Sequence, residues 1–165
     1  MGGVGCLYPS EFMSELSVPT VALAAEVACT DGRTLAGRIF VPAASDRSGP
    51  MRPEDWINEP LPFFPFLPDD AAVPVILNKQ TVIMVTLQGA EGTEGEVLIG
   101  LERRVVIECG ERRIEGLLHI DMPENLQRLQ DYLNRNELFV TLTDGPRHHL
   151  VQKHHITRVI EIREE

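Results

Sequence analysis

The feature of this chain that most constrains its fold is an internal repeat. The segment ILNKQTVIMV at residues 76–85 returns as LVQKHHITRV at residues 150–159. Three further blocks correspond in the same order: DGRTLAGRIFV (31–41) with GERRIEGLLHI (110–120), RPEDWIN (52–58) with RLQDYLN (128–134), and LPFFPFL (61–67) with ELFVTLT (137–143). Four blocks in one order predict a chain built by duplication of a single small unit.

Each copy has the pattern of a small β structure. Apolar residues in the second block recur at every second position, which is the spacing of one strand face. The Asp31-Gly32 and Cys109-Gly110 pairs are typical of hairpin turns, and Gly37 and Gly116 mark bends in a strand. We expect about five strands in each copy, with a short helix between the second and third strands.

The expected helices differ in length. In the first copy a helical turn should begin near Pro53, which suits a first helical position, and end at Asn58 in a left-handed conformation. In the second copy PENLQRLQDYLN, residues 123–134, has leucines at helical spacing and predicts a longer amphipathic helix.

The domain boundaries follow from the repeat. We expect an N-terminal tail over residues 1–19, a first barrel over 20–88, an acidic glycine-rich linker over 89–102 and a second barrel over 103–165.

The aromatic segment of the first copy carries its own expectations. Phe63, Phe64 and Phe66 should belong to the core, and exposure at an interface is the alternative. Pro62 and Pro65 lack an N–H and should confine this strand to an edge or to irregular pairing.

Composition narrows the class of protein. The chain of 165 residues has a net charge of −10, which repels phosphate backbones and acidic membrane surfaces. Its three cysteines, Cys6, Cys29 and Cys109, have no framework spacing, and the last two lie in apolar runs where buried thiols are expected. No segment has the roughly 20 apolar residues of a membrane span, and the first residues lack a signal-peptide pattern. We therefore expect a cytoplasmic protein.

The bent strand with its glycine, the R-x-x-D-x-x-N element, the aromatic strand and the closing strands joined by LNKQTV or VQKHHI together resemble the Sm-like small barrel. The resemblance covers about residues 20–87 and 103–162. It implies two tandem Sm-like barrels, similar to bacterial proteins of that fold. In RNA-binding members the aspartate, the asparagine and a basic residue before the last strand line an RNA pocket. The matching residues here are Asp55, Asn58, Lys79, Asp131, Asn134 and Lys153.

The same residues also have a structural interpretation, in which they stabilise a helical turn. Arg52 with Asp55, and Arg128 with Asp131, are three residues apart, so a helical turn permits an ion pair in each copy. The glycine that follows the basic residue in the family is replaced by Gln80 or His154.

Histidines cluster near the C-terminus. Four of the five lie in HHLVQKHHI, and histidine is a common metal ligand. In a strand, alternate residues share a face, yet no cysteine or carboxylate stands at a ligand-like spacing. An exposed, non-ligating cluster is the simpler expectation, and a metal site is the alternative. The residues are His148, His149, His154 and His155.

No nucleophile elbow, P-loop or dinucleotide-binding motif is present, so we expect no catalytic residues, no cofactor and no enzyme activity. Three functions remain. The favoured one is a protein-interaction or self-assembly module whose edge strands pair with a partner protein or another copy of the chain. The second is RNA binding through Lys79, Lys153 and the arginines Arg103, Arg104, Arg112 and Arg113. The third is a metal-responsive role of the histidine cluster.

Overall fold

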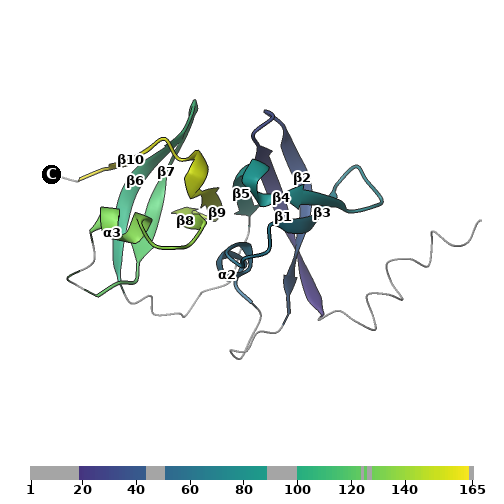
Figure 1. The fold of residues 1–165 in the computed structure, drawn as a ribbon, viewed down its shortest axis with the longest axis horizontal. Coiled ribbons are helices and arrows are strands. Elements are labelled where there is room, and N and C mark those ends of the chain that lie inside the picture. The colour runs from purple at the N-terminus through teal and green to yellow at the C-terminus, as the bar shows by residue number, and fades with distance from the viewer. Residues whose placement is uncertain (1–18, 44–50, 89–99, 124, 126–127, 164–165) are drawn as a thin grey trace, which may run out of the picture.

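The computed structural model describes residues 19–43, 51–88, 100–123, 125 and 128–163 (Figure 1). Residues 1–18 of the expected N-terminal tail and residues 89–99 of the expected linker lie outside these ranges. The first strand of the second half begins at Leu101. No helix in the described part of the chain is long and apolar enough to cross a membrane.

Two halves of the chain contain the same elements in the same order. The first half consists of β1 (Thr20–Cys29), β2 (Thr34–Pro42), α2 (Pro53–Ile57), β3 (Phe63–Pro68), β4 (Val75–Asn78), the 3-10 turn η1 (Lys79–Thr81) and β5 (Val82–Gln88). The second consists of β6 (Leu101–Cys109), β7 (Arg112–Ile120), α3 (Leu129–Leu133), β8 (Phe139–Asp144), β9 (Arg147–Gln152), the 3-10 turn η3 (Lys153–His155) and β10 (Arg158–Glu161). The hairpin turns expected after β1 and β6 are present, with Gly32 and Gly110 at positive φ.

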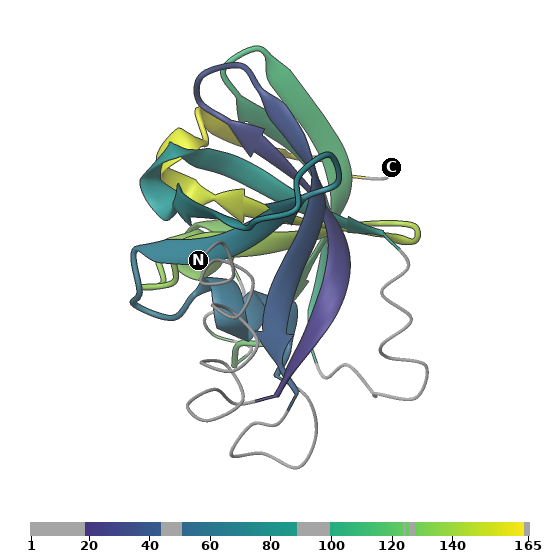
Figure 2. The same ribbon diagram turned by 90° about the vertical axis from the view of Figure 1, so that its right-hand side faces the viewer.

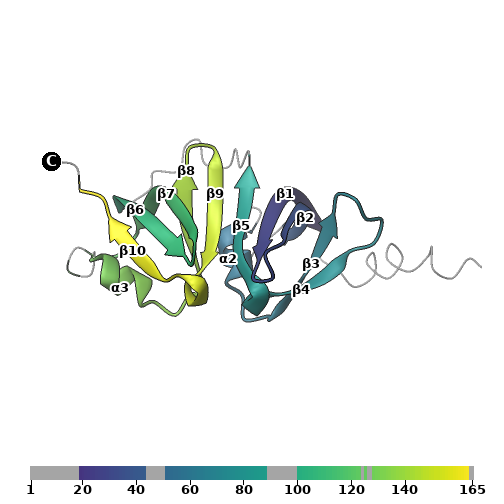
Figure 3. The same ribbon diagram turned by 90° about the horizontal axis from the view of Figure 1, so that it is seen from above.

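All ten strands belong to one antiparallel sheet. Its order is β10-β6-β7-β8-β9-β5-β1-β2-β3-β4, so the last strand of the first half lies between the two halves and pairs with β9 (Figure 3). The mainly-β prediction is therefore confirmed. Within the described residues the sheet does not close, and β4 and β10 are its two ends.

The helical predictions need correction. The expected helix over residues 123–134 is too long, because Arg128 has an extended backbone and α3 starts only at Leu129. Part of that segment lies outside the described residues. In the first half α2 begins at Pro53 as expected, but Asn58 ends it in a right-handed conformation with φ of −88°. The Asn58 side-chain amide donates to the Glu54 carbonyl, and this hydrogen bond favours a right-handed backbone conformation at Asn58.

The aromatic strand is only partly in the core. Phe64 and Phe66 are buried as expected, whereas Phe63 is 53% exposed. The alternation of strand faces explains the difference, because Phe64 and Phe66 lie on the core face of β3 and Phe63 lies on the opposite face. β3 is also the second strand from the end of the sheet, because β4 lies outside it. Pro65 faces Ile76 of β4, while β2 pairs only from Phe66 onward.

The two apolar clusters of the sheet meet where the halves join. One cluster is centred on β1, β2 and β5 and includes Phe139 and Leu150 from the second half. The other is centred on β6, β7 and β8 and takes Met84 from the first. Cys29 and Cys109 are buried, as predicted. The two halves therefore share packing instead of forming separate units.

The bend in β2 depends on a missing side chain. Figure 2 shows β1 and β2, in purple and blue, as long curved strands. A Cβ at Gly37 would lie 2.1 Å from the Leu67 carbonyl oxygen, and one at Gly116 would lie 2.6 Å from that of Thr143. Backbone atoms cannot yield as a flexible side chain can, so only glycine fits at either position.

We expect Gly37→Ala to lower the free energy of unfolding by about 1–3 kcal/mol, because the methyl group would force β2 and β3 apart. The change is measured by urea denaturation. Ala36→Ser, at the exposed neighbouring position, is the control and should stay within about 0.5 kcal/mol of the parent. Equal stability of all three proteins would contradict the close approach of the strands.

Candidate functional site

The two lysines of the expected RNA pocket have the same structural environment. The Nζ of Lys79 donates to the Glu59 carbonyl at 2.8 Å, and the Nζ of Lys153 donates to the Arg135 carbonyl at 2.8 Å. Lys79 is only 5% exposed. Burial lowers the pKa of both lysines, and a neighbouring glutamate partly opposes that shift. Each lysine thus ties a 3-10 turn to the segment that follows the helix.

The aspartates lie on the short helices. Asp131 accepts from the Arg128 Nε at 2.9 Å, which confirms the expected ion pair at three-residue spacing in α3. Asp55 is exposed in the first turn of α2, and the Arg52 guanidinium lies 3.6 Å from a Glu54 carboxylate oxygen. These carboxylates are surface groups.

Asn58 connects the two halves of the chain. Its Oδ1 accepts from the Phe139 N–H at 2.8 Å, and its Nδ2 donates to the Phe139 carbonyl at 3.3 Å. Both main-chain groups of one residue in β8 are therefore satisfied by one amide from the end of α2. Asn134 occupies the same place after α3, and its side chain is exposed.

The four histidines do not form one site. His149 is buried, and its Nδ1 lies 2.9 Å from the Thr86 Oγ1 across the two halves. His155 Nε2 lies 2.8 Å from the Gln80 carbonyl. His154 is exposed, and His148 is half-buried on β9. In the described ranges, no group of three or more histidine, cysteine or acidic side chains is arranged to hold a metal ion.

The junction between the halves is a regular antiparallel ladder between β5 and β9. Five residue pairs form it, in a register that places Met84 opposite Val151 and Gln88 opposite Arg147. The partners within the ladder are Met84 with Val151, Val85 with Leu150, Thr86 with His149, Leu87 with His148, and Gln88 with Arg147. In the described sheet this is the only pair of neighbouring strands that joins the two halves.

Apolar side chains fill one face of the junction. Val85 and Leu87 from the first half pack in the same buried cluster as Phe139 and Leu150 from the second, and none of the four is more than 3% exposed. Burial of such residues supplies about 1.5–3 kcal/mol each relative to exposure. The junction is therefore part of the hydrophobic core as well as a ladder of main-chain hydrogen bonds.

The two ends of the sheet expose the same kinds of residue. On β4 and the strand beside it, Ile76 is 65% exposed, Val75 40% and Phe63 53%. On β10, Ile160 is 38% exposed. Each end strand pairs on one side only within the described sheet, so main-chain N–H and C=O groups remain available on its outer side. The sequence predicted that edge strands pair with a partner and gave exposure of Phe63 as an alternative, but it did not identify β4 and β10 as the ends of the sheet.

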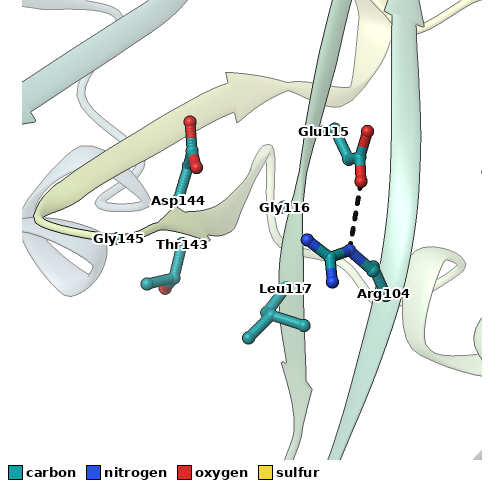
Figure 4. Close-up of a pocket in the computed structure, with 7 residues that line it drawn as sticks. All are labelled: Arg104, Glu115, Gly116, Leu117, Thr143, Asp144 and Gly145. Carbon is teal, nitrogen blue, oxygen red and sulfur yellow. Dashed lines mark hydrogen bonds and ion pairs between the residues drawn. The ribbon is translucent and has the colours of Figure 1, made fainter.

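The surface of the described residues also has hollows, two of which lie near these elements. One, of about 310 Å³, lies where β7 and β8 separate (Figure 4). Arg104 and Glu115 form an ion pair of 3.1 Å at its rim. The other, of about 260 Å³, lies between the two 3-10 turns and is lined by Gln80, Gln152, His154 and His155. Neither places a nucleophile beside a base.

Asn58→Ala should destabilise the chain more than Asn134→Ala. The first change leaves both main-chain groups of Phe139 without their partner, at a cost of about 1–3 kcal/mol. The second removes an exposed side chain and should cost less than about 0.5 kcal/mol in dilute protein. Urea denaturation measures both. A result in which the two variants lose the same stability would show that Asn58 does not hold the halves together.

The buried His149 predicts a pH dependence of stability. Burial lowers its pKa, an effect that Arg147 and His148 increase and Asp144 opposes. The unfolded chain therefore takes up a proton before the folded chain does, and stability falls as the pH drops below about 6.5. His149→Gln should show a shallower fall between pH 7 and pH 5. His154→Gln, at an exposed position, should keep the parent slope. Parallel slopes for all three proteins would contradict this role of His149.

Comparisons with known proteins do not assign a family. No protein-family model, no curated protein and no solved structure matches the chain. The features of the described fold that bear on function are the β5–β9 junction and the two end strands, β4 and β10.

Proposed function

We propose that this protein is a non-catalytic protein-interaction and self-assembly module, built from two duplicated Sm-like small barrels, which acts by strand addition at the free ends of its sheet. The observation that carries the proposal is the pair of end strands, β4 and β10, each with an unpaired outer side and exposed apolar residues. Exposed edges of this kind are templates for pairing with another chain.

The repeated order of elements supports the duplication. Each half places its strands in the sheet in the same order, with its last strand beside its first and its fourth strand at the far side. Five short, bent strands with a helix after the second are the arrangement that the Sm-like resemblance implies. Under the proposal, duplication joins the two units within one chain through β5 and β9. It leaves β4 of the first unit and β10 of the second unit as the end strands.

The geometry gives less support to the other two functions. The RNA hypothesis needs Lys79 and Lys153 for phosphate or base contacts, but both ammonium groups are directed to main-chain carbonyls. The metal hypothesis needs converging histidines, whereas His149 is bound to Thr86 and His155 to Gln80. Strand addition uses groups that the described fold leaves without a neighbour.

Self-assembly should be visible as a mass that rises with protein concentration in light scattering coupled to gel filtration. Ile76→Lys or Ile160→Lys places a charge on an end strand and should shift the protein to the monomer, since edge lysines oppose pairing. Leu61→Lys is the matched control, because Leu61 is also apolar and 62% exposed but lies in the loop before β3, outside every strand. A parent protein that stays monomeric at high concentration would refute self-assembly.

A further inference from the structure

In the first half, the loop after β3 continues the ladder with β2. Gly37 of β2 faces Pro68 at the end of β3. One position further, the Asp69 N–H donates to the Ala36 carbonyl at 3.0 Å. The main chain of β2 is therefore paired as far as Ala36 on this side.

In the second half, the equivalent ladder between β7 and β8 stops two positions earlier. Its last pair in the described residues is Leu117 with Thr143, and β8 then turns into β9. Glu115 has the place of Ala36, because it directly precedes Gly116, the glycine at the bend of β7. Among the described residues, no main-chain group of β8 or of its turn binds the main chain of Glu115.

A shorter connection after β8 explains this difference. Asn78 follows its partner Phe63 by 15 positions, whereas Gln152 follows its partner Phe139 by 13. The second half therefore has two residues fewer between its third and fourth strands. Its tight turn at Gly145, with φ of +56°, leads the chain into β9 before it can pair further along β7.

The space left beside β7 is the hollow of about 310 Å³ described above, which we call the β7–β8 hollow. Figure 4 shows its residues from β8 and the following turn on one side and those from β6 and β7 on the other. In the first half the Ala36 carbonyl is directed to this side of its strand. The main-chain groups of Glu115, its equivalent, therefore face the β7–β8 hollow.

We infer that the β7–β8 hollow binds an extended, basic segment of another protein, which pairs with the main chain of β7 at Glu115. An unpaired stretch of strand is a template for an extended peptide. The volume of the hollow is at the lower end of the range of about 300–1,000 Å³ for ligand pockets, which suits a short stretch of peptide. The site is separate from the end strands β4 and β10, so it adds a second binding surface to the proposed function and does not depend on strand addition at the ends.

The charges around the β7–β8 hollow favour a basic segment. Arg104 and Glu115 form an ion pair of 3.1 Å, so these two charges balance one another. Asp144 lines the hollow and is exposed, and within the described residues no cation forms an ion pair with its carboxylate. A lysine or arginine of the bound segment would meet this carboxylate, and the net charge of −10 attracts basic segments at longer range.

The N-terminal residues of the chain itself have the wrong charge for this site. Residues 1–18 contain two glutamates and no lysine or arginine. The charge at Asp144 therefore favours a segment of another protein over this part of the same chain.

Titration with a defined peptide tests the site. The probe is acetyl-(Thr-Lys)₃-amide, added to the ¹⁵N-labelled full chain and followed by NMR. We expect the amide resonances of Glu115 and Thr143 to shift as the peptide binds, because both residues line the β7–β8 hollow. The same peptide methylated at every main-chain nitrogen keeps its charge but cannot donate to the Glu115 carbonyl, and should bind about tenfold more weakly. Equal affinity of the two peptides would overturn main-chain pairing.

The Asp144→Asn variant tests the charge. It should bind the lysine peptide about two- to fivefold more weakly, which is the range for an exposed ion pair. Asp69→Asn is the matched control, because Asp69 lies in the equivalent connection of the first half, where the chain pairs with itself. This variant should bind like the parent. If Asp144→Asn also binds like the parent, the partner is not selected by charge and the inference fails.

Hydrogen exchange at the Glu115 amide identifies other occupants. This amide should exchange rapidly in the full chain alone and about tenfold more slowly with saturating peptide. Protection without peptide that is lost when residues 1–18 are removed would show the N-terminal segment as the occupant, and protection that rises with protein concentration would show a second copy. Either result would overturn the inference. A parent that is monomeric by light scattering but binds the peptide as expected would refute self-assembly and support this site.

Discussion

The ladder between β5 and β9 is the contact on which the rest of the structure depends. It turns two five-strand units into one ten-strand sheet and buries Val85, Leu87, Phe139 and Leu150 together. Without it each unit would expose a further sheet edge and an apolar face, at a cost of about 25 cal/mol for each Å² of apolar surface. The same ladder determines which strands remain outside, since only β4 and β10 lack a neighbour on one side in the described sheet.

Three of the six polar residues that resemble an RNA pocket bind main-chain groups in this structure. Lys79 and Lys153 satisfy main-chain carbonyls, and Asn58 satisfies both main-chain groups of Phe139. A buried carbonyl or N–H without a partner costs about 1–3 kcal/mol, which is enough to favour these residues in both halves. Recurrence of a polar motif in a duplicated chain can therefore reflect main-chain satisfaction at equivalent turns.

Local patterns in the sequence predicted most of the strands, and non-local pairing explains most of what they missed. Alternation, turn glycines and the bend at Gly37 depend on neighbouring residues, so the mainly-β class and the hairpins were predictable. The burial of His149 depends on the strand that lies beside it, and no short stretch of sequence contains that information. The helix over residues 123–134 was predicted too long because leucine spacing does not reveal the extended backbone of Arg128.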